Sequence, residues 1–444
     1  MYNYPKGFYI DVRIEDRFTT RITYRNGILQ EQKVRSNKGA FIRVFNGERW
    51  YYASLTNLDS IQNQMDTLAS MATPNPNIDK HPSVLMYEVH HEELMQYTDN
   101  SLKNVSLKQK NAFVKQIADL CTDETIKMTN VFYVDDVTVK EIYTSKGTNI
   151  KFDKQTCGVG MAMQCAYENN KNDFSSSVAQ VSFDLLEKDI PYFKEELQKN
   201  IEFIKHAESF EPGEYPVLMG PLATGVFTHE SFGHKSESDF MVGDEAMRKE
   251  WTLGKQVGPS LLSIIDDGTV LGNGYVPFDD EGTKGKKTHI ITKGMLTDRL
   301  HSVGTAAALE ENPTGNARSI NFEYEPIVRM TTTYIEKGTT PLKDIIKGIE
   351  YGVFVDTIKH GSGMSTFTIA PSRAYKIEKG EITTPIKLSV ITGNVFETLG
   401  LIDAVSEEFK LLSFVGGGCG KMEQFPLPVG FGGPFTLVRK LNVM

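Results

Sequence analysis

Two periods of hydrophobic residues run through the first half of the chain. Apolar and polar residues alternate over 8–14 and again in several runs between 131 and 185, a pattern typical of strands with one buried face. Hydrophobic residues recur every three or four positions in three other segments, which predicts helices within 54–72, 106–121 and 190–207. We therefore expect helices packed on a largely antiparallel sheet, an α+β arrangement.

Turn signals connect the predicted strands. Asn26-Gly27 and Asn46-Gly47 are dipeptides that favour type I′ hairpin turns. Lys146-Gly147 and the polar segment 169–173 separate three alternating runs. We interpret these runs, the last of which is Val181, Phe183 and Leu185, as an antiparallel meander.

The pattern changes at FEPGEYP (210–216), a segment that breaks the helical period. The chain beyond it is richer in glycine and contains short predicted strands at 286–292, 326–335, 373–378 and 386–392. Residues 416–434 are dense in Gly and Pro, so they cannot form a helix, and their backbone is free to approach another group closely. We place the domain boundary at the start of the FEPGEYP segment, with an N-terminal α+β domain at 1–210 and a β-rich domain at 211–444.

Composition and charge narrow the class of protein. The 444 residues are 40% hydrophobic and 24% charged, an ordinary globular balance. The net charge of −9 argues against a protein that works mainly on nucleic acid, because such proteins carry a basic surplus. No run approaches the about 18 apolar residues of a membrane span, and the N-terminus lacks a secretory pattern. Four cysteines are too few for a disulfide scaffold, so we expect a cytoplasmic protein with reduced thiols.

The segment Thr228–His234 (THESFGH) carries the main chemical signal, two histidines that bracket a glutamate. In an α-helix, His229 and His234 at i, i+5 would lie about 140° apart, whereas the about 40° of an i, i+4 pair suits a shared metal. A π-bulge would bring both rings back to one face, and Gly233 is a position that tolerates such a distortion.

Two histidines do not complete a metal site, because catalytic zinc usually has three protein ligands and an open fourth position. A cysteine or a carboxylate could be the third ligand, and Cys419 stands out because glycines surround it in GGGCG. A His₂Cys site would leave Glu230 free as the general base that removes a proton from water as it attacks a carbonyl. The residues alone leave open a chance HExxxH pattern and a structural Cys419.

Five ordered blocks resemble the TldD/PmbA family, and their order and spacing match across the C-terminal half. The N-terminal half agrees in length and pattern, with weaker motifs. The blocks are HESFGHKSESD (229–239), DDEGTKG (279–285), PTGNARS (313–319), RMTTTY (329–334) and CGKMEQFPLPVGFGGP (419–434).

The resemblance implies a metallopeptidase of the "modulator of DNA gyrase" family with a barrel-like C-terminal domain. It implies one metal ion, bound by His229, His234 and Cys419, with Glu230 catalytic; a thiolate with two imidazoles favours zinc. Family members assemble as dimers, so a homodimer or a heterodimer with a related subunit is expected. Partner subunits have lost these residues, and this chain keeps all four, like the competent TldD-type subunits.

Four further polar residues are weaker candidates. Glu237 and Asp239 could orient the ligating imidazoles through hydrogen bonds, or lie at a solvated helix end. Asn316 and Arg318 could contact the backbone or a carboxylate of a substrate, or belong to an ordinary turn.

The expected function is zinc-dependent hydrolysis of short or unfolded peptides, which an open sheet edge could bind by strand addition. Two alternatives stay open. One is a regulatory binding protein of the gyrase-modulator type with a structural metal. The other is a hydrolase that uses Cys419 as the nucleophile and His229 or His234 as the base.

Overall fold

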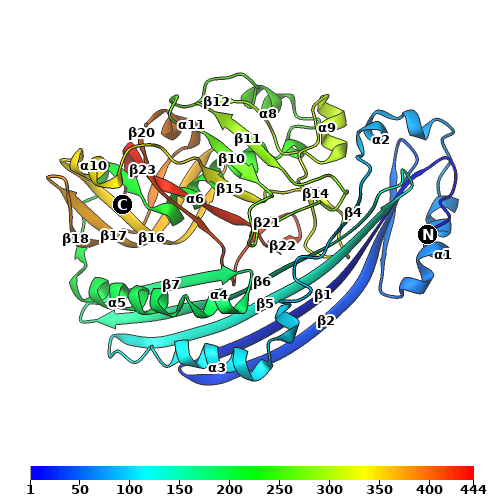
Figure 1. Ribbon diagram of the computed structural model, residues 1–444. Helices are drawn as coiled ribbons and strands as arrows, with labels where there is room; N and C mark the ends of the chain where they lie inside the picture. Colours follow the sequence, from blue (N-terminus) through cyan, green and yellow to red (C-terminus); the bar gives the residue numbers. More distant parts are fainter. Residues whose placement is uncertain (1) are drawn as a thin grey trace.

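The computed structural model describes residues 2–444, and its first half forms a curved sheet of long strands (Figure 1). The strands are β1 (Tyr9–Arg25), β2 (Ile28–Phe45), β3 (Trp50–Leu55), β4 (His91–Leu94), β5 (Ile126–Thr144), β6 (Asn149–Tyr167) and β7 (Asn170–Gln180). Their order is β3-β2-β1-β5-β6-β4, with β7 paired to β6. All of these pairings are antiparallel except that of β4 with β6.

The helices of this half are α1 (Ile61–Ser70), α2 (Pro82–Met86), α3 (Leu107–Ala118), α4 (Phe183–Glu187) and α5 (Ile190–His206), with 3₁₀ turns η1 (Leu58–Ser60), η2 (Ile78–Lys80) and η3 (Leu102–Asn104). α1, α3, α4 and α5 cover one face of the sheet, whereas α2 and η2 pack with Tyr9 and Phe45 on the other face. Phe113 of α3 and Phe193 of α5 join one buried core with Tyr133 of β5 and Val159 of β6. The three helices predicted within 54–72, 106–121 and 190–207 are therefore confirmed as α1, α3 and α5. They form because their apolar stripes pack on the apolar face of the strands.

The other face of the sheet is charged and also buried. Arg13 of β1 and Lys140 of β5 both contact Asp280 of the second half, at 3.2 Å and 2.5 Å between charged atoms. Arg43 of β2 similarly pairs with Glu281 at 3.1 Å. These polar positions of the alternating strands thus face the second half of the chain, whereas Arg21, farther along the same face of β1, is exposed to water.

Two local predictions for the first half were wrong. Residues 181–185 do not form a strand: α4 begins at Phe183, because the Ser182 side chain accepts a hydrogen bond from Leu185 N and caps a helix. Asn46-Gly47 belongs to a four-residue connection in which the Asn46 side chain accepts from Arg49 N. Asn26 and Gly27 both have positive φ (49° and 74°), as a type I′ turn requires.

The second half forms a sheet of twelve strands. They are β8 (Glu208–Ser209), β9 (Gly213–Met219), β10 (Ile264–Asp267), β11 (Lys287–Thr292), β12 (Met295–Leu296), β15 (Thr332–Ile335), β16 (Tyr351–Gly363), β17 (Thr366–Glu378), β18 (Glu381–Lys387), β19 (Ile391–Asn394), β20 (Ile402–Leu412) and β23 (Gly430–Val443). β9, β16, β17, β19 and β23 pair in sequence and close a ring, so the expected barrel is confirmed. The domain boundary at residue 210 stays a prediction.

Two short hairpins and several helices complete this half. The hairpins pair β13 (Ala317–Arg318) with β14 (Ile327–Val328), and β21 (Cys419–Lys421) with β22 (Gln424–Leu427). The helices are α6 (Pro221–Thr228), η4 (His229–Gly233), α7 (His234–Ser236), η5 (Ser238–Phe240), α8 (Glu245–Glu250), α9 (Val303–Leu309), α10 (Leu342–Lys347) and α11 (Val395–Gly400). Among the helices described, none is both long and apolar enough to cross a bilayer.

Helix α6 lies within the ring of strands, where it contacts β9, β16, β17 and β23 (Figure 1). A Cβ on Gly225 would lie 2.5 Å from Gly432 N, so only glycine permits this approach of helix and strand. Ala223 and Phe227 are buried in the main core of this half. The barrel therefore fixes the helix whose C-terminal end begins the HExxxH segment.

Candidate metal centre

The HExxxH segment continues α6 as a π-helix. Residues His229–Gly233 form η4, and the backbone N–H of His234 donates to the carbonyl of His229, five residues earlier. A Cβ on Gly233 would lie 1.8 Å from Met330 Sδ, so any larger residue here would have to displace the Met330 side chain. The predicted π-distortion is confirmed, and it directs both histidines to the same side.

The two histidines converge with Cys419. One ligand atom from each of His229, His234 and Cys419 lies within 4.8 Å of the others, and Cys419 Sγ is 3.5 Å from His234 Nε2. Burial alone would raise the pKa of the Cys419 thiol, but the two imidazoles lower it to about 5 through charge and hydrogen bonding. The sulfur is therefore held as a thiolate at neutral pH, the form that binds metals.

Arg329 fixes the backbone that carries the cysteine. Its guanidinium donates to the carbonyl of Cys419 at 2.7 Å and to that of Gln424 at 3.2 Å, which spans both strands of the β21–β22 hairpin. Arg329 is fully buried. Since charge-assisted hydrogen bonds are strong when buried, this side chain holds the hairpin against the histidines.

Glu237 contacts the second ring nitrogen of a histidine. Its Oε2 lies 3.1 Å from His234 Nδ1 and 3.0 Å from Lys421 Nζ. Burial opposes ionisation of Glu237, but His234 and Lys421 lower its pKa below the usual range. Burial would lower the pKa of His234, yet Cys419 and Glu237 raise it to about 10. Asp239 does not contact either histidine; it holds Lys421 Nζ at 2.7 Å.

Glu230 lies between the two histidines in sequence and is partly buried. Burial raises the pKa of its carboxyl, and the neighbouring His229 and His234 partly offset that effect. A carboxyl whose pKa moves toward neutrality is better suited to accept and release a proton during catalysis.

Asn316 and Arg318 are buried beside the site and hold the protein's own groups. Asn316 Nδ2 donates to Asp266 Oδ2 at 2.8 Å and to the carbonyl of Arg329 at 3.0 Å. Arg318 donates to the carbonyls of Met330 and, at 2.7 Å, Pro428. A contact of either side chain with substrate stays a prediction.

Sequence reasoning missed Arg329 and Lys421, although both lie inside motif blocks, RMTTTY and CGKMEQF. Their residue types are a usable signal, because a buried Arg or Lys needs acceptors close by. These acceptors are distant along the chain, so only the fold reveals them. Cys419 lies 90 residues from Arg329, and Glu237 and Asp239 lie 184 and 182 residues from Lys421.

The donor set fits zinc. Two imidazoles and a thiolate are its usual ligands. His229 Nδ1 is buried and has no hydrogen-bond partner among the described residues.

Comparison with known proteins gives the same family throughout the chain. Residues 212–444 match the model of the PmbA/TldA metallopeptidase C-terminal domain, and 10–72 match that of PmbA/TldA metallopeptidase domain 1. The chain is 30% identical to a metalloprotease of Synechocystis sp. over 98% of its own length and 94% of that protein. It is 31% identical to a zinc metalloprotease TldD homolog of Saccharolobus solfataricus, with 72% of each chain covered.

The solved structures agree in fold. The structure of TldE from Thermococcus kodakarensis superposes with a TM-score of 0.76 at 16% identity, covering 98% of this chain and 96% of that one. The family models, the two relatives and the His-His-Cys cluster agree, and the chain belongs to the TldD/PmbA family of metallopeptidases.

Proposed function

We propose that this protein is a zinc-dependent peptidase that hydrolyses short or unfolded peptides. In this proposal His229, His234 and Cys419 hold one zinc ion and Glu230 is the general base. The observation that carries it is the convergence of three ligand atoms within 4.8 Å around a π-turn, with Glu230 left outside the ligand set. A purely structural site would need no such carboxylate.

Each residue has a separate task in the reaction. When bound, zinc would supply a Lewis acid that polarises the scissile carbonyl and acidifies water. The Glu230 carboxylate accepts the proton of the attacking water and returns it to the leaving amide nitrogen. Glu237 keeps His234 in one orientation by accepting a hydrogen bond from Nδ1. Arg329 keeps the Cys419 backbone in place.

Peptide binding by strand addition is supported by the hairpin beside the site. β21 and β22 form a sheet of two strands, and no third strand among residues 2–444 pairs with it. A free strand edge binds an extended backbone through main-chain hydrogen bonds, which nearly every residue offers. Stable folded domains do not expose such a backbone, so they would resist cleavage.

We also propose that the active form is a dimer, either of two copies or with a related subunit. Residues 28–38 of β2 extend beyond β3 as a largely exposed strand. Ile28 is 67% exposed and Val34 is 48% exposed. A second subunit covering this strand would remove apolar surface from water.

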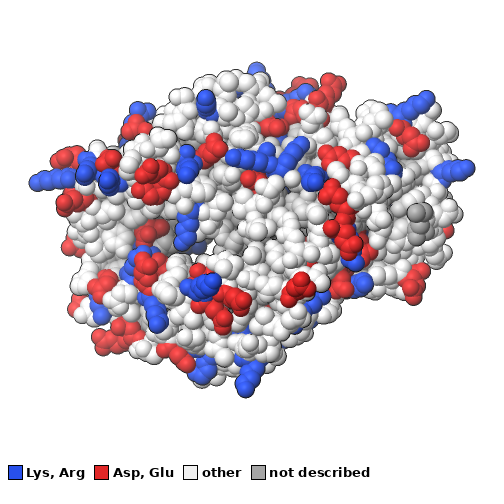
Figure 2. Space-filling model, in the orientation of Figure 1, with Lys and Arg blue, Asp and Glu red and all other residues white. Residues whose placement is uncertain are grey.

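Direct binding of nucleic acid is not part of the proposal. Figure 2 shows basic and acidic residues interspersed over the visible face rather than a continuous basic patch. Together with the net charge of −9, this supports weak binding to duplex DNA at physiological salt.

One observation favours a second candidate, a thiol hydrolase. Cys419 has a pKa lowered to about 5 and lies 3.5 Å from His234 Nε2, the arrangement of a thiolate–imidazolium pair. The two mechanisms differ in their need for metal.

A metal assay joined to a peptide digest tests the proposal. Purified protein should contain about one zinc per chain. It should cut denatured casein, lose that activity with a chelator, and regain it with added zinc. Activity that survives complete metal removal would contradict the metallopeptidase and favour the thiol hydrolase. A metal-loaded protein that cuts no peptide would favour a regulatory role.

A further inference from the structure

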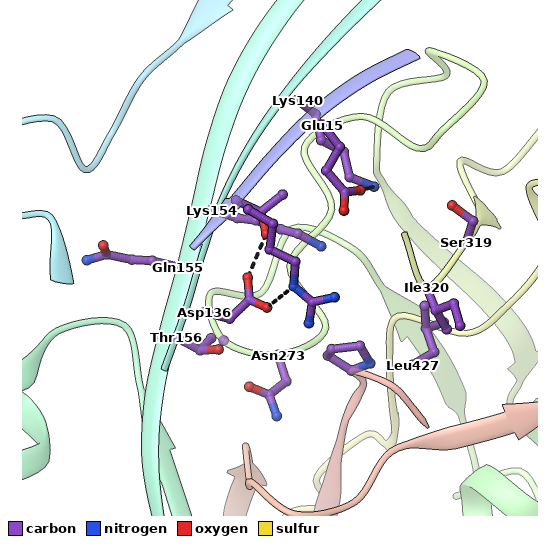
Figure 3. Close-up of a pocket in the computed structure, with 14 residues that line it drawn as sticks. Glu15, Asp136, Lys140, Lys154, Gln155, Thr156, Asn273, Ser319, Ile320 and Leu427 are labelled. Atoms are coloured by element: carbon purple, nitrogen blue, oxygen red, sulfur yellow. Dashed lines mark hydrogen bonds and ion pairs between the residues drawn. The ribbon is translucent and has the colours of Figure 1, made fainter. Parts of the chain in front are cut away.

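A small cavity, partly open to solvent, lies between the inner face of the first sheet and the second half of the chain (Figure 3). Lys154 of β6 and Lys140 of β5 line it on the sheet side. Ser319, Leu427 and Pro428 line it from the second half. It is built from both halves of the molecule, so it exists only in the folded whole chain.

Most charges in this cavity are already paired. Arg17 contacts Asp136 at 2.5 Å, and Lys140 contacts Asp280 at 2.5 Å. Among the described residues, Lys154 has neither a carboxylate within 4.0 Å nor a hydrogen-bond partner for its Nζ. Figure 3 shows its side chain directed into the open space from β6. The amine of Lys154 is therefore without a partner among the residues described, in a recess of the protein.

Lys154 also lines a second, smaller cavity. Its other lining residues include Lys140, Arg318 and Asp280. Arg318 donates to backbone carbonyls and has no ion-pair partner among the described residues. Among the described residues, two basic side chains that lack an ion-pair partner within 4.0 Å thus line the same space, together with the carboxylates of Asp279 and Asp280.

The protonation of Lys154 also responds to a ligand. Burial lowers its pKa to about 7, and the like charges of Lys140 and Arg318 act in the same direction, against weaker attraction by Asp136 and Asp280. An arriving anion would favour the protonated amine and offset the cost of burying it.

The cavity adjoins the candidate metal centre. Leu427 pairs directly with Cys419 across the β21–β22 hairpin, and Pro428 follows it. The strand that lines the cavity (β22) and the strand that carries the cysteine (β21) are therefore neighbours, about 5 Å apart. A peptide held along this hairpin would reach the cavity within a few residues.

We propose that Lys154 binds a carboxylate of the peptide held at the metal centre, either the C-terminal carboxylate or an Asp or Glu side chain. This inference rests on the proposed peptidase function. A carboxylate suits the space better than a phosphate group, because Glu15, Asp136 and Asp280 in the cavity walls would repel a dianion.

Binding of matched peptides to full-length, zinc-loaded protein tests the proposal. The Glu230→Gln background slows hydrolysis so that binding can be measured by fluorescence anisotropy. The probe is a ten-residue peptide of Ala, Thr, Val and Ser with an uncharged dansyl label on its N-terminus, made with a free C-terminus, with a C-terminal amide, and as the amide with one internal Glu. The expected result is about tenfold tighter binding of a carboxylate-bearing peptide than of the uncharged amide.

Variants at position 154 then assign the effect. Lys154→Met should abolish the preference, and Lys154→Arg should retain most of it. Lys151→Met is the matched control, because Lys151 lies on the opposite face of β6, 3.8 Å from Glu141. It should leave the preference unchanged. Circular dichroism and thermal melting confirm that each variant is folded.

The outcomes separate the inference from the proposed function. A preference for the free C-terminus identifies the terminal carboxylate as the ligand, and a preference for the internal Glu identifies a side chain. Equal binding of all three peptides would overturn the inference even without the variants at position 154, and it would not contradict the proposed peptidase function. A preference that survives in folded Lys154→Met would also overturn it. Failure of every peptide to bind would count against both.

Discussion

The contact between Glu237 and His234 predicts a measurable loss of zinc affinity. Glu237→Gln keeps the size of the side chain and an acceptor oxygen, but it removes a buried negative charge that faces His234 Nδ1 at 3.1 Å and Lys421 Nζ at 3.0 Å. A neutral amide polarises the imidazole less and holds it less firmly. Carboxylates in this position typically contribute 10–100-fold in metal affinity, about 1.4–2.8 kcal/mol.

Competition with a chromogenic chelator measures the zinc Kd directly. The matched control is Glu311→Gln, because Glu311 pairs with His301 Nε2 at 2.8 Å in the same kind of contact but outside the metal centre. Glu311→Gln should leave the zinc Kd unchanged. The reasoning would be refuted if folded Glu237→Gln bound zinc as tightly as the wild type, or if both variants weakened zinc equally.

Three further predictions follow from the same geometry. Glu230→Gln should retain zinc while peptide hydrolysis falls about 10²–10⁴-fold; unchanged turnover of metal-loaded protein would exclude Glu230 as the base. Gly233→Ala should lower the free energy of unfolding by about 1–3 kcal/mol, because its Cβ would lie 1.8 Å from Met330 Sδ; an unaltered denaturant midpoint would show that Met330 moves aside freely. One polypeptide offered folded and denatured should be cut only when denatured, as mass spectrometry of the fragments would record; equal cutting would contradict binding through an exposed backbone.

The sequence was sufficient for features encoded by nearby residues. The i, i+5 spacing of His229 and His234 required a π-distortion to bring the rings together, and the backbone adopts it. The long alternating runs predicted the antiparallel strands because one face of each is apolar. The α4 helix was missed because three apolar residues at period two are too few to separate a strand from a helix; the Ser182 cap was the better local signal.

What the sequence could not supply is the partner of each polar residue. Polar positions such as Arg13 and Lys140 fit a solvent-facing strand surface. Both side chains are nevertheless buried, and both pair with Asp280, which lies 140 residues beyond Lys140. Alternation distinguishes the two faces of a sheet but does not say what covers the polar one. For the same reason Arg329 and Lys421 could not be assigned to the metal centre before the hairpin was placed.

The enclosure of α6 by the barrel has a consequence for how the protein acquires its metal. Zinc fingers fold only when the ion arrives, so much of their binding free energy goes into ordering the chain. Here α6, which leads directly into the segment that carries the histidines, is embedded in the main core, whose amides should exchange with solvent only on global unfolding. The apoprotein should therefore present its ligands already in register, and zinc loading should proceed without a refolding step. Hydrogen exchange in α6 should then already be slow in the metal-free protein, and zinc should slow it further only by the free energy of metal binding.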